Sequence, residues 1–320
     1  MLEGGGLCSH KDDCTERSTT DLGSSKNFAN QIDLPAFQSS DEKSNPDWYQ
    51  ANQVFIPYCT GDVHSGTRTE TSDETFGFYF SGHHVVSSVV DDLKQNKGLD
   101  NADLIIFAGA SAGGMGVITN VDYVASKLSN AKVLGVPIGG YIFAHENYQG
   151  DGAVIEPENA RAQDFERDAE LFQGFNSQRG SKCATELRNT SWECEIPTTN
   201  FLFVESPMFV IESQIDSVVM FDFSNAPEVN TSEVASYVEK FRTNSTKYAQ
   251  VVVESKTATI FSVSCFMHTN FDRGSPTVDG TDYYNMLYSA AHAVLDGTSL
   301  PESKVDACEG IPCGTNCPAM

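Results

Sequence analysis

The feature that most constrains this chain is a serine set among glycines after an apolar run, in the stretch Ile105-Ile-Phe-Ala-Gly-Ala-Ser-Ala-Gly-Gly-Met-Gly116. The residues before Ser111 are typical of a buried strand, and those after it carry apolar side chains at helical spacing. A strand, the pattern Gly-x-Ser-x-Gly and a helix together predict a sharp turn that exposes a nucleophilic hydroxyl. We expect Gly109 and Gly113 to be small because this turn brings the strand and the helix close together.

Further apolar runs alternate between strand and helix patterns. The expected strands cover residues 53–57, 103–108, 132–136, 207–212 and 259–263, and the expected helices cover 80–93, 115–128, 158–173 and 281–295. This alternation predicts an α/β fold with a mainly parallel sheet flanked by helices. No linker or repeat is evident, so we expect one domain over residues 1–320, with a polar irregular insertion at about 145–200 and a Cys-rich tail at about 305–320.

A serine nucleophile needs a base to accept its proton, and in this architecture an acid and then a histidine follow the serine along the chain. Two histidines lie far enough downstream, His268 and His292. His268 lies in the loop just after the expected strand 259–263, where a catalytic base belongs. His292 lies within the last expected helix, which favours a packing or surface role.

The acid that orients the base is expected at the end of a neighbouring strand. Asp216 follows the expected strand 207–212, and Glu212 and Asp222 are the competing carboxylates. Three strand ends in the required order therefore predict a catalytic triad of Ser111, Asp216 and His268.

Acyl transfer also requires hydrogen-bond donors for the oxyanion. The residue after the nucleophile supplies one backbone N–H, which is that of Ala112 here. A glycine-rich loop commonly supplies the second, and Leu2-Glu-Gly-Gly-Gly-Leu7 fits this role through Gly5 and Gly6. Two further histidines, His64 and His145, are candidates for lining the substrate site, although the loop that holds His64 also fits a supporting role beneath the elbow. We expect no metal site.

Nine cysteines favour an oxidising compartment, with Cys8–Cys14 and Cys183–Cys194 as the natural local disulfides and at least one free thiol. Three glycosylation sequons agree with this route, at Asn189, Asn230 and Asn244. The start of the chain lacks the pattern of a signal peptide, so we expect that the sequence begins downstream of the true N-terminus.

The net charge of −24 disfavours binding to nucleic acid and to anionic membranes. No apolar run has the length of a membrane span, so we expect no stable membrane insertion. Nothing in the sequence indicates an oligomeric state.

Four blocks resemble the pectin acetylesterase/Notum family of serine carboxylesterases. They are Leu2-Glu-Gly-Gly-Gly-Leu-Cys8, Phe55-Ile-Pro-Tyr-Cys-Thr-Gly-Asp-Val-His-Ser-Gly66, Gly109-Ala-Ser-Ala-Gly-Gly-Met-Gly116, and the strand ends that carry Asp216 and His268. The resemblance implies an extracellular enzyme with an α/β-hydrolase fold and no cofactor. It places the family's triad on the residues already chosen, and its oxyanion donors on Gly5, Gly6 and Ala112.

The chain departs from this family in two ways. Members similar to Notum carry a tryptophan where this chain has Gly6, which changes the expected wall of the acyl pocket. The family's fold also has strands ahead of the Leu-Glu-Gly-Gly motif, so we expect a sheet that lacks its first strands. The resemblance implies hydrolysis of acetyl esters on a pectin-like cell-wall or matrix polysaccharide. The alternatives are removal of a fatty acyl group from a secreted protein, and a non-catalytic carbohydrate-binding or truncated inactive relative.

Overall fold

A computed structural model of the chain describes residues 1–32, 34, 36–145, 147–148, 150, 175, 177, 181–224, 226–227 and 232–318. The expected helix at 158–173 and the sequon residue Asn230 lie outside the described residues. The single domain with an insertion at about 145–200 therefore stays a prediction.

The centre of the fold is a parallel sheet with the strand order β1-β2-β3-β4-β7. Its strands are β1 (Leu104–Ala110), β2 (Lys132–Ile138), β3 (Met208–Asp216), β4 (Ala258–Met267) and the short β7 (Lys304–Val305). Two shorter strands, β5 (Thr277–Val278) and β6 (Thr281–Asp282), form a separate antiparallel pair. Parallel strands need crossover connections, and the helices between them provide these. The mainly parallel α/β sheet flanked by helices that the sequence predicts is confirmed.

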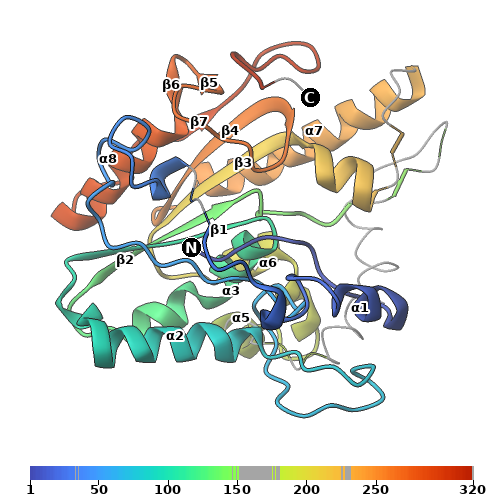
Figure 1. Ribbon diagram of the computed structural model, residues 1–320. Helices are drawn as coiled ribbons and strands as arrows, with labels where there is room; N and C mark the ends of the chain where they lie inside the picture. Colours follow the sequence, from blue (N-terminus) through green and yellow to red (C-terminus); the bar gives the residue numbers. More distant parts are fainter. Residues whose placement is uncertain are drawn as a thin grey trace.

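Four long helices cover the sheet: α2 (Gly82–Lys97), α3 (Ala112–Ser126), α7 (Ser232–Val253) and α8 (Tyr283–Asp296). Figure 1 shows α2 and α3 together on one side of the sheet and α8 on the other. Shorter elements are α1 (Lys11–Arg17), α5 (Ser181–Glu186), α6 (Pro197–Phe201), η1 (Ser25–Asn27), η2 (Ala36–Gln38), η3 (Leu99–Asn101), η4 (Ser191–Glu195) and the π-helix η5 (Val218–Phe223). The helix α7 was not expected from the sequence.

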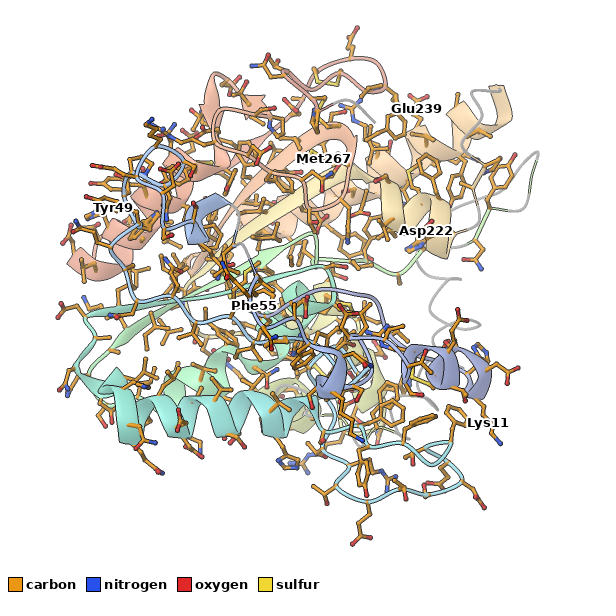
Figure 2. The ribbon with its side chains drawn as sticks, viewed as in Figure 1. Lys11, Tyr49, Phe55, Asp222, Glu239 and Met267 are labelled. Carbon is orange, nitrogen blue, oxygen red and sulfur yellow. A yellow bond between two sulfur atoms is a disulfide. The ribbon has the colours of Figure 1, made fainter. Side chains whose placement is uncertain are left out.

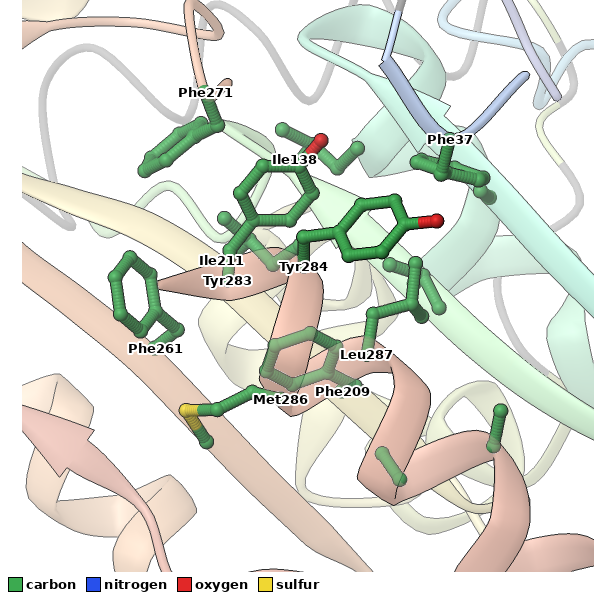
Figure 3. Close-up of a cluster of buried hydrophobic side chains, with 14 of the residues drawn as sticks. Phe37, Ile138, Phe209, Ile211, Phe261, Phe271, Tyr283, Tyr284, Met286 and Leu287 are labelled. Atoms are coloured by element: carbon green, nitrogen blue, oxygen red, sulfur yellow. The ribbon is translucent and has the colours of Figure 1, made fainter. Parts of the chain in front are cut away.

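The two faces of the sheet build two cores because side chains alternate along each strand. On β3, Met208 and Val210 pack with the buried residues of α2, α3 and α7. Phe209 and Ile211 point to the other face and pack against α8, where Tyr284 and Leu287 meet them (Figure 3). Both faces of the strands are apolar, which explains why these segments read as continuous hydrophobic runs.

Beyond β1 the sheet continues through single bridges rather than a named strand among the described residues. Leu2 pairs in parallel with Gly109 on one side and with Ile56 on the other. The Leu2 amide donates to the Ala108 carbonyl (2.8 Å), and the Ala110 amide donates back to Leu2 (3.2 Å). The expected strand at 53–57 thus contributes one bridge, and the N-terminal segment is held against β1.

Four disulfides link Cys8–Cys14, Cys183–Cys194, Cys265–Cys317 and Cys308–Cys313. The two local pairs are those expected from the spacing, and Cys59 is the free thiol. Within the described part of the chain, no helix combines the length and apolarity needed to cross a bilayer.

Candidate active site

Ser111 occupies the turn between β1 and α3 with a backbone that few residues adopt. Its φ of 54° and ψ of −122° lie outside the regions favoured by side chains larger than glycine. The Ser111 amide donates to the Ile138 carbonyl at the end of β2 (2.8 Å), and its own carbonyl accepts from Met115 in the first turn of α3 (3.1 Å). Such conformations cost about 1–3 kcal/mol and persist where the surroundings enforce them.

The two glycines that flank this turn are required by contacts between backbones. A Cβ on Gly109 would lie 2.1 Å from the Gly113 carbonyl oxygen. A Cβ on Gly113 would lie 2.3 Å from the carbonyl oxygen of Leu2. The first contact is the close approach of strand and helix that the sequence predicts, whereas the second involves the N-terminal segment.

Asp216 and His268 meet at the ends of adjacent strands. Asp216 is the last residue of β3. Met267, which is labelled in Figure 2, is the last residue of β4, and His268 is the next residue along the chain. The Asp216 Oδ2 atom lies 2.6 Å from His268 Nδ1, and the side chains are 4% and 12% exposed. Asp216 Oδ1 accepts from the Val219 amide (2.9 Å), which fixes the carboxylate.

The second ring nitrogen of this histidine is available for chemistry. His268 Nε2 is buried and has no hydrogen-bond partner among the residues that the structure describes. When the neutral ring donates its Nδ1 proton to Asp216, Nε2 is the unprotonated nitrogen, which is the form that a general base requires. Gly139, the residue after β2, packs closely against the histidine, because a Cβ on Gly139 would lie 3.2 Å from His268 Nδ1.

The competing residues occupy other places. Asp222 is exposed on η5 (Figure 2), and His292 is exposed on α8, where its ring contacts Tyr288. Glu212 is buried on β3, four residues before Asp216, and its carboxyl oxygens accept from the Tyr141 amide (2.9 Å) and the Ser213 amide (3.1 Å).

The segment that contains the predicted oxyanion donors passes over the nucleophile. A Cβ on Gly4 would lie 3.0 Å from the Ser111 Cβ, so the two residues are in contact. Gly5 and Gly6 have φ values of +134° and +66°, which favour glycine. Apart from its two chain neighbours, no residue that the structure describes has a heavy atom within 4 Å of a Cβ built on Gly6. Ala112 begins α3 directly after the nucleophile and is buried.

His64 lies beneath this segment. It is 1% exposed, its ring stacks on Tyr58, and its Nε2 lies 2.9 Å from the Glu3 carbonyl oxygen. A carbonyl only accepts, so Nε2 carries the proton, and burial lowers the pKa of the ring. These contacts favour a supporting role for His64 beneath the elbow. A role in lining the substrate site stays a prediction.

The remaining predicted residues are His145 and the sequon residues Asn189 and Asn244. His145 is half-buried and packs edge-on against Phe143 and Phe241, so its contact with substrate stays a prediction. Asn189 is exposed in a turn. Asn244 is 4% exposed within α7, which disfavours a glycan at this sequon in the folded chain.

Two residues close to the site were not predicted to contribute. Arg17 in α1 donates to the Gly5 carbonyl (2.8 Å), twelve positions away, and nothing in the local sequence pattern indicates this contact. Glu212 was considered only as a rival to Asp216. Its spacing of four residues within a strand signals a same-face pair, but the sequence alone does not reveal that both are buried.

Comparison with known proteins places this arrangement in a family. The profile of the family described as Pectinacetylesterase matches residues 1–318. The palmitoleoyl-protein carboxylesterase notum1a of Danio rerio is 26% identical over 100% of this chain and 66% of its own length. Pectin acetylesterase 4 of Arabidopsis thaliana is 29% identical over 67% of this chain and 50% of its own length.

The fold has a counterpart among solved structures. The Wnt deacylase Notum from Drosophila superposes with a TM-score of 0.85 at 24% identity, covering 99% of this chain and 89% of that one. The chain spans between half and two thirds of the length of the two curated relatives named above. With the profile covering almost every residue, the chain belongs to the pectinacetylesterase family.

Proposed function

We propose that this chain is a serine carboxylesterase that works through an acyl-enzyme. The observation that carries the proposal is the 2.6 Å contact between Asp216 and His268 at two strand ends, with a free Nε2 on the imidazole. Together with the strained turn at Ser111, this contact supports a catalytic triad in the order that the elbow requires. The names of the relatives, which are carboxylesterases and pectin acetylesterases, support the same reaction class.

In this mechanism each residue has one task. Ser111 Oγ attacks the ester carbonyl while His268 Nε2 accepts its proton, and Asp216 stabilises the imidazolium that forms. The backbone N–H groups of Gly5, Gly6 and Ala112 stabilise the tetrahedral oxyanion. His268 then protonates the leaving alcohol, and it activates the water that releases the acyl group.

The substrate that we propose first is an O-acetyl ester on a pectin-like polysaccharide. Support comes from Gly6, which stands where members similar to Notum carry a tryptophan, and beside which no described residue outside its chain neighbours fills the space of a side chain. The second candidate is removal of a fatty acyl group from a secreted protein. An apolar cluster that joins Ala112 to Phe80, Phe175 and partly buried Met115 favours this candidate, because it lies next to a proposed oxyanion donor.

The four disulfides support an extracellular or cell-wall location for this activity. The net charge of −24 supports a partner other than nucleic acid.

The test is hydrolysis of 4-nitrophenyl esters from acetate to palmitate, alongside acetate release from acetylated pectin. Ser111→Ala should abolish turnover, and a fluorophosphonate probe should label the wild type but not this variant. A preference for short esters with acetate release supports the polysaccharide deacetylase, and a preference for long chains supports the lipid deacylase. A folded wild type that hydrolyses none of these esters and takes up no probe would sink the enzyme proposal.

A further inference from the structure

The segment Glu3–Gly6 has several glycines and no side chain beyond Glu3 to hold it. Residues without a Cβ move readily between backbone conformations, and Gly5 and Gly6 both have positive φ. An oxyanion hole, however, depends on donors that are already aimed before charge develops. Something outside the segment must therefore fix its peptide planes, if the function proposed above is correct.

Arg17 makes the contact that does this. Its Nη1 donates to the Gly5 carbonyl (2.8 Å) and its Nε donates to the Leu22 carbonyl (2.8 Å). The guanidinium also lies over the ring of Tyr58, 5.0 Å from the centroid. Two carbonyls and an aromatic face thus hold the planar group, and a guanidinium keeps its charge at all working pH values.

The geometry of the peptide bond transmits this contact to the site. The cis peptide bonds in the described chain precede Pro276 and Pro312, so the Gly5–Gly6 bond is trans. In a trans peptide the C=O and the following N–H point in opposite directions within one plane. Fixing the Gly5 oxygen toward Arg17 therefore directs the Gly6 N–H away from Arg17.

We propose that Arg17 is a positioning residue that holds the Gly5–Gly6 peptide plane so that the Gly6 N–H faces the developing oxyanion. His64 restrains the preceding part of the segment through the Glu3 carbonyl. The cationic partner also polarises the Gly5–Gly6 peptide, which strengthens the Gly6 N–H as a donor.

The position of Arg17 is itself tied to the segment that it holds. It is the last residue of α1, and the Cys8–Cys14 disulfide joins this helix to Cys8, two residues after Gly6. The helix and the oxyanion segment therefore form one cross-linked unit.

The experiment compares Arg17→Met, which keeps an unbranched side chain beside Tyr58 but removes the donors, with Arg17→Lys, which keeps the charge and one donor. Arg242→Met is the matched control, because the Arg242 guanidinium also donates to two backbone carbonyls, those of Cys308 and Gly310, in the C-terminal tail. The readouts are kcat and KM for 4-nitrophenyl acetate, and the inhibition constant of a boronic acid that mimics the tetrahedral oxyanion.

Arg17→Met should lower kcat about 10²-fold, the scale of losing one oxyanion donor, with KM changed less than threefold. Affinity for the boronic acid should fall by a similar factor, Arg17→Lys should recover part of kcat, and Arg242→Met should keep it. If Arg17→Met does not fold, the same split between kcat and KM is read from Arg17→Lys. An active wild type whose Arg17 variants keep kcat and boronic acid affinity would overturn this inference alone, whereas an inactive wild type would overturn the proposed function.

Discussion

The carboxyl of Glu212 offers a sharp test of how the site holds charge. Its side chain is 6% exposed on β3, between the amides of Tyr141 and Ser213, and it hydrogen-bonds to the side chain of Asp216. Burial raises the pKa of Glu212 well above its usual 4.5, and the neighbouring negative charge of Asp216 raises it further. We therefore expect Glu212 to be a neutral acid that donates its proton to Asp216 while Asp216 accepts from His268.

The perturbation is Glu212→Gln, which keeps the shape of the side chain and a donor but cannot ionise. The pKa of Glu212 is higher in the folded chain than in the unfolded chain, so its bound proton stabilises the fold. This stabilisation is fully present below the unfolded pKa and is lost as pH rises through the folded pKa. Between these two pKa values, the unfolding free energy of the wild type falls by about 1.4 kcal/mol per pH unit relative to that of the variant. The unfolding free energy of Glu212→Gln minus that of the wild type should therefore rise with this slope above pH 4.5, and flatten once the folded pKa is passed.

The assay is urea unfolding at half-unit steps from pH 4 to 9, with the disulfides intact. Glu70→Gln, at an exposed position, controls for the substitution itself. If the unfolding free energies of the wild type and Glu212→Gln change with pH in parallel, the pKa of Glu212 is not raised in the folded chain, and the reasoning is refuted. Ester hydrolysis by Glu212→Gln should remain within about tenfold of the wild type, because the amide can still donate to Asp216.

Three further changes probe the turn, the acyl site and the base. Gly109→Ala places a Cβ 2.1 Å from the Gly113 carbonyl oxygen, so denaturant unfolding should show a loss of about 3 kcal/mol or more; wild-type stability would contradict the close approach. Gly6→Trp places a ring beside the proposed oxyanion donor, in space that no described residue outside the chain neighbours of Gly6 fills. The ratio of kcat/KM for octanoyl over acetyl 4-nitrophenyl esters should then rise about tenfold, as burial of two methylenes allows; an unchanged ratio would place the acyl chain elsewhere. Asp216→Asn should lower kcat about 10³–10⁴-fold near pH 7, because the amide favours the wrong tautomer of His268; a smaller loss than tenfold would assign the acid to another carboxylate.

The strands and the elbow could be predicted because their signals are local. Buried strands such as β1 and β3 are apolar on both faces, and the turn at Ser111 needs glycines within two positions of the serine. The pairing of Asp216 with His268 also followed from local signals, since parallel strands bring their carboxyl ends to one edge of the sheet. The choice between Asp216 and its rivals rested on the same logic.

The parts that escaped prediction depend on contacts between distant segments. The helix α7 was missed because acidic and basic residues between Glu233 and Arg242 obscure an apolar stripe that includes Val234, Val238 and Phe241. The contact of Arg17 with Gly5 depends on how α1 folds back after the Cys8–Cys14 bridge. Neither propensity nor spacing carries this information, because the energetic gain arises only once the tertiary contact exists.

The elbow itself is a three-part structure, although its motif looks like a property of five residues. Gly109 is required by the helix, since its Cβ would meet the Gly113 carbonyl, but Gly113 is required by Leu2 and Glu3, whose carbonyl oxygens would lie 2.3 and 2.8 Å from its Cβ. The same Leu2 backbone pairs with β1 at the edge of the sheet. One short segment therefore extends the sheet, packs on the first turn of α3 and brings the proposed oxyanion donors over Ser111. A substitution that loosens Leu2 from β1 must then reduce stability and oxyanion geometry together, so the second glycine of the elbow connects the fold to the proposed chemistry.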